Sequence, residues 1–82
     1  MDFSDRLIEL IQSRGITRRE LAQSVNVSER LLYYYVAGQK TPNMETLIAL
    51  ADFFNVSLDY LVGRTDDPTP PKRSSSSNEP GS

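Results

Sequence analysis

The chain has 82 residues, the size of one small domain, and its net charge at pH 7 is −2. It contains neither Cys nor His, which excludes thiolate and imidazole metal sites, disulfides, cysteine nucleophiles and histidine acid–base chemistry. No apolar run reaches the roughly 18 residues of a membrane span, and the N-terminal MDFSDR lacks the features of a signal peptide. We therefore expect a cytoplasmic protein without a metal or cofactor.

Five segments have the pattern of a helix start. In each, a capping residue follows an apolar residue, and a second apolar residue comes four positions after the cap. They are Phe3-Ser4-Ile8, Ile16-Thr17-Leu21, Val27-Ser28-Leu32, Pro42-Asn43-Leu47 and Val56-Ser57-Leu61. The cap accepts a free backbone N–H and the apolar pair fixes the entering chain, while Thr17 with Glu20 adds a capping box. Residues that tolerate a left-handed backbone follow the segments, namely Gly15, Asn26, Gly38, Asn55 and Gly63. The combined pattern predicts helices near residues 5–14, 18–25, 28–36, 44–54 and 58–62.

Apolar side chains at helical spacing in these segments predict one shared core. The candidates are Leu7, Leu10, Ile11, Leu21, Ala22, Val25, Leu32, Tyr35, Leu47, Leu50, Ala51, Phe54, Leu58 and Leu61. No segment alternates apolar and polar residues as a half-buried strand does. We therefore expect a small all-α domain over residues 1–63, of modest stability unless it dimerises.

Residues 64–82 have a different composition, with four of the five prolines, a run of four serines and no large apolar residue. Such a segment buries too little surface to offset the entropy of ordering it, so we expect a disordered tail or linker. Its basic pair Lys72-Arg73 fits either a DNA contact or ordinary solvated charge, and the second interpretation is favoured.

Residues 17–38 have the pattern of two short helices joined by a tight turn, an arrangement that presents the second helix to the DNA major groove. Residues 14–40 carry five basic and two acidic side chains, a net charge of +3, whereas residues 1–13 and 41–63 carry −2 and −3. Because salt screens charges beyond about 8–10 Å, this local positive charge can attract phosphates although the whole chain is acidic.

Residues 5–63 resemble the Cro and phage-repressor type of helix-turn-helix domain, also called the xenobiotic-response-element family. The matching residues are Gly15-x-Thr17-x-x-Glu20-Leu21-Ala22, Val27-Ser28, Gly38-Gln39-Lys40-x-Pro42, Thr46-Leu47-Ile48-x-Leu50-Ala51 and Val56-Ser57-Leu58-Asp59-Tyr60-Leu61-x-Gly63. The resemblance implies a lambda-repressor-like bundle of five helices that binds operator DNA, generally as a dimer, and regulates transcription.

The sequence departs from the family pattern at several positions. Arg18 replaces a common Gln and Asn26 replaces a turn Gly, and both substitutions suit their positions. Ile11 and Val36 replace a buried Arg–Glu pair, and we expect these two apolar side chains to pack together. The centre of the recognition helix, residues 32–35, is aromatic where the family has small or amide side chains. Helical spacing places Tyr35 inward, and it places Tyr33 and Tyr34 outward or sideways.

The resemblance and the docking geometry of such helices give two sets of candidate DNA contacts. The base-reading candidates are Ser28, Glu29, Arg30, Tyr33 and Tyr34, and the phosphate-contacting candidates are Arg18, Arg19, Gln23, Gln39, Lys40, Thr41 and Asn43. Arg30 suits guanine, Glu29 suits cytosine, Tyr34 suits a thymine methyl group, and the Tyr33 hydroxyl suits a phosphate. The alternatives are a solvated Glu29–Arg30 pair, a Tyr33 ring that covers the core edge, and an Arg19 bound by Glu20 or Gln23.

The function we expect is sequence-specific DNA binding by a transcriptional regulator, with repression favoured. Residues 28–36 would enter the major groove of a near-palindromic operator, and the protein would act as a homodimer. Phe53 is a candidate dimer contact, although it fits packing under the last helix equally well. An interaction module without DNA binding is the alternative, favoured by the net acidity and the bulky tyrosines. An enzyme has little support, because Asp52 and Asp59 are the only acid pair of note.

Overall fold

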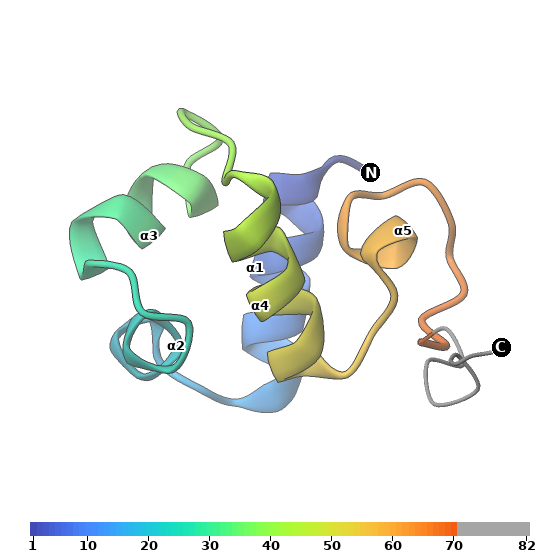
Figure 1. The fold of residues 1–82 in the computed structure, drawn as a ribbon, viewed down its shortest axis with the longest axis horizontal. Helices are drawn as coiled ribbons and strands as arrows, with labels where there is room; N and C mark the ends of the chain where they lie inside the picture. The colour runs from blue at the N-terminus through green and yellow to red at the C-terminus, as the bar shows by residue number, and fades with distance from the viewer. Residues whose placement is uncertain (71–82) are drawn as a thin grey trace, which may run out of the picture.

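A computed structural model describes residues 1–70, which form five helices without a strand among them (Figure 1). The helices are α1 (Phe3–Arg14), α2 (Arg18–Ser24), α3 (Glu29–Val36), α4 (Met44–Phe54) and α5 (Leu58–Leu61). The predicted all-α fold of five helices is therefore confirmed. Residues 71–82, which include Lys72-Arg73 and most of the predicted tail, lie outside the described residues. In the described part of the chain, no helix is both long enough and apolar enough to cross a membrane.

Helices α1 and α4 occupy the middle of the molecule (Figure 1). Helices α2 and α3 contact each other on one side of this pair, and α5 lies on the other side in contact with α1 and α4. Helix α1 also contacts α3, so it connects the two ends of the bundle. The helix-turn-helix unit and α5 therefore stand at opposite ends of the fold.

The core contains the predicted apolar side chains with small differences. Eleven of the fourteen candidates are buried, and Ile11, Leu47 and Leu58 are partly buried against them. Val56 is buried as well, although the sequence pattern placed it only as the residue before a cap. The largest fully buried side chains are Leu7, Leu21, Leu32, Leu50, Phe54 and Leu61. Each of the five helices contributes to one shared core.

Four of the five predicted helix caps are confirmed. Thr17, Ser28, Asn43 and Ser57 each accept a backbone N–H of the first turn, and Thr17 and Glu20 form the predicted capping box. The predicted cap at Ser4 is wrong, because Asp2 caps α1 by accepting the Asp5 N–H at 3.0 Å, and the helix begins at Phe3. A carboxylate is the stronger acceptor and also interacts favourably with the helix dipole. The Ser4 hydroxyl instead donates to the Val36 carbonyl at 2.8 Å and connects α1 to the end of α3.

All five predicted helix stops adopt the left-handed backbone, at Gly15, Asn26, Gly38, Asn55 and Gly63. Gly63 has a second reason to be glycine, because a Cβ atom at this position would collide with the carbonyl oxygen of Met1. The end of α5 and the start of the chain therefore pass very close to each other.

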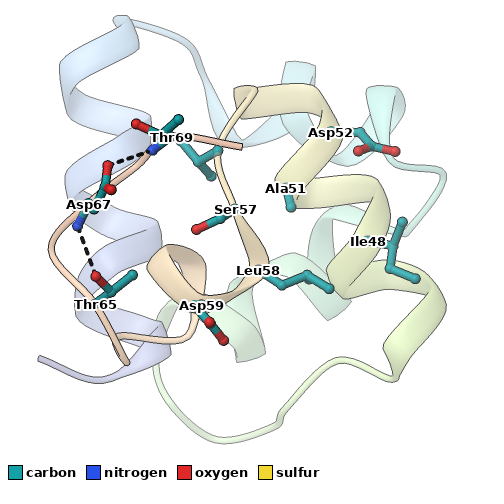
Figure 2. A pocket seen from close by; sticks show the side chains of 10 residues that line it. Ile48, Ala51, Asp52, Ser57, Leu58, Asp59, Thr65, Asp67 and Thr69 are labelled. Carbon is teal, nitrogen blue, oxygen red and sulfur yellow. Dashed lines mark hydrogen bonds between the residues drawn. The ribbon is translucent and has the colours of Figure 1, made fainter. Parts of the chain in front are cut away.

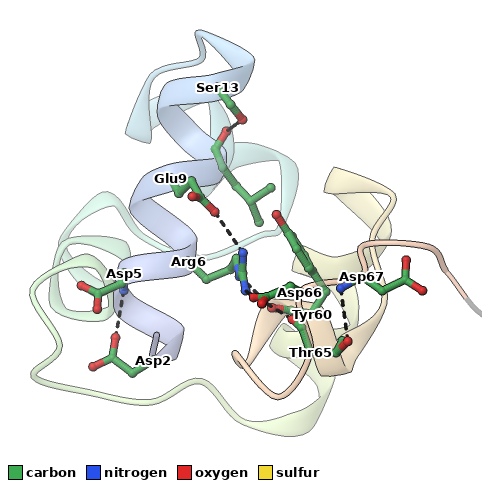
Figure 3. A network of polar contacts seen from close by, with 10 residues as sticks. Asp2, Asp5, Arg6, Glu9, Ser13, Tyr60, Thr65, Asp66 and Asp67 are labelled. Atoms are coloured by element: carbon green, nitrogen blue, oxygen red, sulfur yellow. Dashed lines mark hydrogen bonds and ion pairs between the residues drawn. The ribbon is translucent and has the colours of Figure 1, made fainter.

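A buried arginine on α1 joins the two ends of the described chain (Figure 3). Only 4% of Arg6 is exposed; its Nε donates to the Tyr60 carbonyl at 3.0 Å, and its guanidinium lies over the Tyr60 ring at 3.8 Å from the centroid. The same group donates to Glu9 at 3.1 Å and to Thr65 O and Asp66 at 3.3 Å. Burial lowers the pKa of Arg6, but Tyr60, Glu9 and Asp66 raise it more, so the group stays charged.

These contacts extend past Gly63, where the sequence predicts the domain boundary. The Thr65 carbonyl and the Asp66 carboxylate accept from Arg6, and the Ser57 N–H donates to the Pro68 carbonyl at 3.1 Å. Hydrogen bonds therefore hold the residues that follow Gly63 against Arg6 of α1 and against Ser57, the cap of α5 (Figure 3).

Candidate nucleic-acid interface

The turn between α2 and α3 fixes the angle between the two helices. Asn26 supplies the left-handed residue of the turn, with φ of 60°, and the Val27 N–H donates to the Ala22 carbonyl at 3.0 Å. Leu32 and Tyr35 anchor the inner face of α3 in the core, and the Tyr35 ring meets the edge of Phe3 at 6.5 Å. Because its inner face is fixed in this way, α3 presents one defined outer face to solvent.

The five predicted base-reading residues all lie on the outer face or at the start of α3. Ser28, Glu29 and Arg30 are exposed, Tyr33 is 51% exposed, and Tyr34 is half-buried. The Ser28 hydroxyl accepts the Leu31 N–H at 3.0 Å, so it caps the helix and its own proton stays free to donate. The predicted inward position of Tyr35 is confirmed by its burial.

The charged side chains of α3 have other partners than the sequence suggested. Glu29 and Arg30 do not pair with each other; Glu29 lies 3.9 Å from Arg19, and both of these side chains are largely exposed. The Arg30 Nε instead donates to the Tyr34 hydroxyl at 3.3 Å. Glu20 is engaged in the capping box, where it accepts the Thr17 N–H at 2.8 Å, so it is not the group that binds Arg19.

The seven predicted phosphate-contacting residues are all exposed, and they lie on α2 and on the loop from α3 to α4. Arg18 and Arg19 occupy the first turn of α2, where the helix dipole also favours an anion. Asn43 caps α4 by accepting the Thr46 N–H at 2.9 Å. Helices α2 and α3 lie at the same end of the molecule (Figure 1). Two of the cations lie beside α3, since Arg19 is 3.9 Å from Glu29 and the Lys40 Nζ is 5.0 Å from the centroid of the Tyr34 ring.

A pocket of about 780 Å³ lies at the other end, between α4, α5 and residues 65–69 (Figure 2). Its apolar lining comes from Ile48, Ala51, Val56 and Leu58, and three aspartates, Asp52, Asp59 and Asp67, lie around it. Hydrogen bonds from the Thr69 hydroxyl and backbone N–H hold the pKa of Asp67 below its ordinary value. This acidic surface contains none of the predicted DNA contacts, and its charge would repel phosphates. Within residues 1–70, no group of His, Cys, Asp and Glu is arranged to hold a metal ion.

Two contacts at the interface were not predicted from the sequence. The ring of Tyr34, whose base-reading role stays a prediction, has its centroid 5.0 Å from the Lys40 Nζ and 6.0 Å from the Arg30 guanidinium carbon. Ser4 was expected to cap α1, but it holds the end of α3. The loop sequence Gly38-Gln39-Lys40 carried a signal for the first contact, because a left-handed glycine after a helix turns the chain back toward it.

The chain is similar to a family model, to a bacterial relative and to solved structures. The family model for the helix-turn-helix matches residues 7–61. YobD, an uncharacterized HTH-type transcriptional regulator of Bacillus subtilis, is 34% identical over 68 residues, which cover 83% of this chain and 61% of YobD.

Two solved structures are also similar. A transcriptional regulator from Listeria innocua is 38% identical with a TM-score of 0.72, over 74% of this chain and 57% of that protein. The SOS-response transcriptional repressor LexA from Eubacterium rectale is 26% identical with a TM-score of 0.71, over 98% of this chain and 88% of that structure. The chain spans about three fifths of the length of YobD and of the Listeria protein. Because the family model matches more than half of it, the chain belongs to the helix-turn-helix family of the Cro and phage-repressor type.

Proposed function

We propose that this chain is a sequence-specific DNA-binding transcriptional regulator that inserts α3 into the major groove. The observation that carries the proposal is the geometry of α3, whose inner face is fixed in the core while its outer face is exposed. Arg19 of α2 and Lys40 of the following loop lie beside residues of this helix. Such a rigid helix flanked by phosphate-binding groups is the arrangement by which helix-turn-helix proteins read base sequence.

Base reading falls to the first turns of α3 in this proposal. Arg30 is exposed, and the two terminal nitrogens of its guanidinium are the fork that matches guanine O6 and N7. Glu29 accepts from cytosine N4 and excludes bases that present only acceptors. Ser28 donates its hydroxyl proton, while Tyr33 and Tyr34 extend over the neighbouring base pairs and the backbone.

Phosphate binding falls to residues on both sides of α3. Arg18, Arg19 and Lys40 supply positive charge, and Gln23, Gln39, Thr41 and Asn43 supply neutral donors. These contacts set the position of α3 on the duplex without choosing a sequence. Arg18 contributes more than Arg19, because Arg19 exchanges its contact with Glu29 for the phosphate.

A homodimer completes the proposal, with two copies of α3 about 34 Å apart on a near-palindromic operator. The 38% exposure of Phe53, an aromatic side chain on α4, supports its role as a dimer contact. Repression is the proposed direction of regulation, in line with the SOS-response transcriptional repressor LexA, whose structure is similar. Cytoplasmic location follows from a DNA target in a bacterial type of regulator.

The test is retention of duplex DNA as a function of salt. Three cations in each protomer give six in a dimer, so the logarithm of the association constant should fall with the logarithm of salt concentration with a slope of about −5. Random-sequence and genomic fragments should both be retained at low salt and released as salt rises. If neither kind of fragment is retained at low salt, the chain is an interaction module that has kept the bundle without DNA binding.

A further inference from the structure

Tyr34 is the point at which cations from two segments of the interface meet. The Nε of Arg30, one helical turn earlier on α3, donates to the Tyr34 hydroxyl at 3.3 Å, and its guanidinium carbon lies 6.0 Å from the ring centroid. The Nζ of Lys40, in the loop after α3, lies 5.0 Å from the same centroid. Both distances fall within the range of a cation–π attraction.

The backbone places Lys40 beside this ring. Gly38 adopts φ of 77° and turns the chain back, after which the N–H groups of Gln39 and Lys40 both donate to the Tyr34 carbonyl, at 2.9 and 3.3 Å. The loop therefore begins by doubling back over the end of α3. Lys40 lies beside the Tyr34 ring because these backbone hydrogen bonds hold the loop against the end of α3.

The contacts with Tyr34 leave the DNA-binding atoms of both cations free. Arg30 uses Nε for the hydroxyl, so its two terminal nitrogens remain available as a fork for guanine. An ammonium group has three donors, and attraction to a ring face does not consume them. A flexible cation that is already held in place loses less conformational freedom when it binds its target.

We propose that Tyr34 is a positioning residue that holds Arg30 and Lys40 in place together, so that guanine reading and phosphate binding are coupled through one side chain. This inference rests on the proposed function. It assigns Tyr34 a role in the free protein, before any DNA is bound, and it makes the loop cation part of the reading unit. Tyr33 has no such role, because within the described residues its ring contacts the edge of the Tyr34 ring at 6.0 Å and neither cation.

Three variants separate the parts of this arrangement. Tyr34→Phe keeps the ring and removes the hydroxyl, Tyr34→Leu removes both, and Tyr33→Leu is the matched control on the adjacent exposed residue. NMR of the free proteins reports the ring current of Tyr34 on the Hε protons of Lys40. We expect an upfield shift in the parent chain, in Tyr34→Phe and in Tyr33→Leu, and its loss in Tyr34→Leu.

DNA binding by the same variants reports the coupling. Tyr34→Leu should lower discrimination against a replaced guanine about fivefold, the value of one exposed cation–π contact. It should also reduce the salt slope by up to about 0.9 per protomer, as one phosphate contact is weakened. Tyr34→Phe should lower guanine discrimination and leave the salt slope unchanged. Tyr33→Leu removes the neutral phosphate contact proposed for the Tyr33 hydroxyl, so it should weaken binding to all sequences alike while guanine discrimination and the salt slope stay those of the parent.

The outcomes distinguish this inference from the function on which it rests. If the parent binds no DNA, the proposed function fails, while the Lys40 shift still decides whether the ring holds the lysine. If the parent binds DNA and Tyr34→Leu keeps both the guanine preference and the salt slope, the positioning role is wrong. Thermal melting checks that Tyr34→Leu folds. If Tyr34→Leu does not fold, the two contacts are tested separately. Unchanged guanine discrimination in Tyr34→Phe would show that the Tyr34 hydroxyl does not position Arg30. Lys40 Hε protons without an upfield shift in the parent would show that the Tyr34 ring does not hold Lys40.

Discussion

Arg6 and Arg30 have opposite environments, and only that of Arg30 could be predicted from its sequence neighbours. Arg6 and Arg30 both lie in the first half of a helix beside a glutamate or an aspartate. Arg6 is buried among acceptors that come from residues 60, 65 and 66, far away along the chain. Helical periodicity identifies only which face a residue occupies, so the burial of Arg6 could not be predicted. The exposure of Arg30 could be predicted, because it lies in the first turn after the cap Ser28 and on a different face of the helix from buried Leu32.

Replacing Arg6 with alanine should lower the free energy of unfolding by about 2–4 kcal/mol. The variant leaves the Tyr60 and Thr65 carbonyls without their donor and removes the stacking on Tyr60. Urea denaturation of both chains measures the difference. Arg18→Ala is the control, because Arg18 is exposed and its loss should change stability by less than about 0.5 kcal/mol. Equal effects of the two substitutions would show that the buried network does not stabilise the fold.

Stability should decline at alkaline pH through Tyr35. Burial raises the pKa of this tyrosine in the folded state, so the folded protein keeps the phenol proton at a pH where the unfolded chain has lost it. Tyr35 therefore lowers the free energy of unfolding as pH rises above the ordinary tyrosine value of about 10. Tyr35→Phe should show a smaller loss of stability between pH 8 and pH 11 in urea denaturation. Parallel pH profiles for the two chains would contradict this account.

Local sequence patterns predicted the N-terminal caps of four helices correctly and that of α1 wrongly. Thr17, Ser28, Asn43 and Ser57 cap their helices because each combines a short acceptor side chain with a flanking apolar pair. The same pattern at Ser4 was outcompeted by Asp2, a stronger acceptor two residues earlier. The contact of Ser4 with Val36 joins residues 32 positions apart, and no local rule predicts such a bond.

The contact between α1 and α3 leads to a prediction at Val36. Ile11 and Val36 are both partly buried against the core, and their direct packing stays a prediction. Val36→Glu would place a carboxylate in this region without the arginine that other family members carry at the position of Ile11, and it should lower stability by about 1–3 kcal/mol. Thermal melting measures the loss, with Tyr33→Glu on the exposed face of α3 as the control. A Val36→Glu variant as stable as the parent would show that the two side chains do not pack together.

At the scale of the whole molecule, charge is separated between the two ends. The segment of residues 14–40 has a net charge of +3 and forms α2, α3 and the loop, while residues 41–63 have a net charge of −3. The aspartates of the pocket extend the acidic surface on the side of α5. In the proposed complex, such a distribution would orient the domain on a polyanion with α3 toward the DNA and α5 away from it. The distribution of charge along the chain is visible in the sequence, whereas its place in the molecule follows from the packing of α2 and α3 against each other.

We predict that the chain assembles as a homodimer through a contact that includes Phe53. Phe53 is partly exposed, and the edge of its ring packs on Phe54 at 5.1 Å between centroids. Phe53→Ser should shift the sedimentation of the chain from dimer toward monomer while its helical circular dichroism stays the same. Met44→Ser, at a more exposed apolar position on α4, should leave the dimer intact. If both variants and the parent sediment alike, Phe53 only packs against its neighbour.

Selection of bound sites from a random duplex pool shows whether the outer face of α3 reads bases while α2 positions the helix on the DNA backbone. The parent chain, Arg30→Ala and Arg18→Ala would each be taken through the same selection. Arg30→Ala should lose the preference for guanine at one position of each half-site, a discrimination of about 1–3 kcal/mol. Arg18→Ala should select the same sequence as the parent and bind every site more weakly. A changed base preference in Arg18→Ala, together with an unchanged one in Arg30→Ala, would show that α2 reads bases and that Arg30 does not.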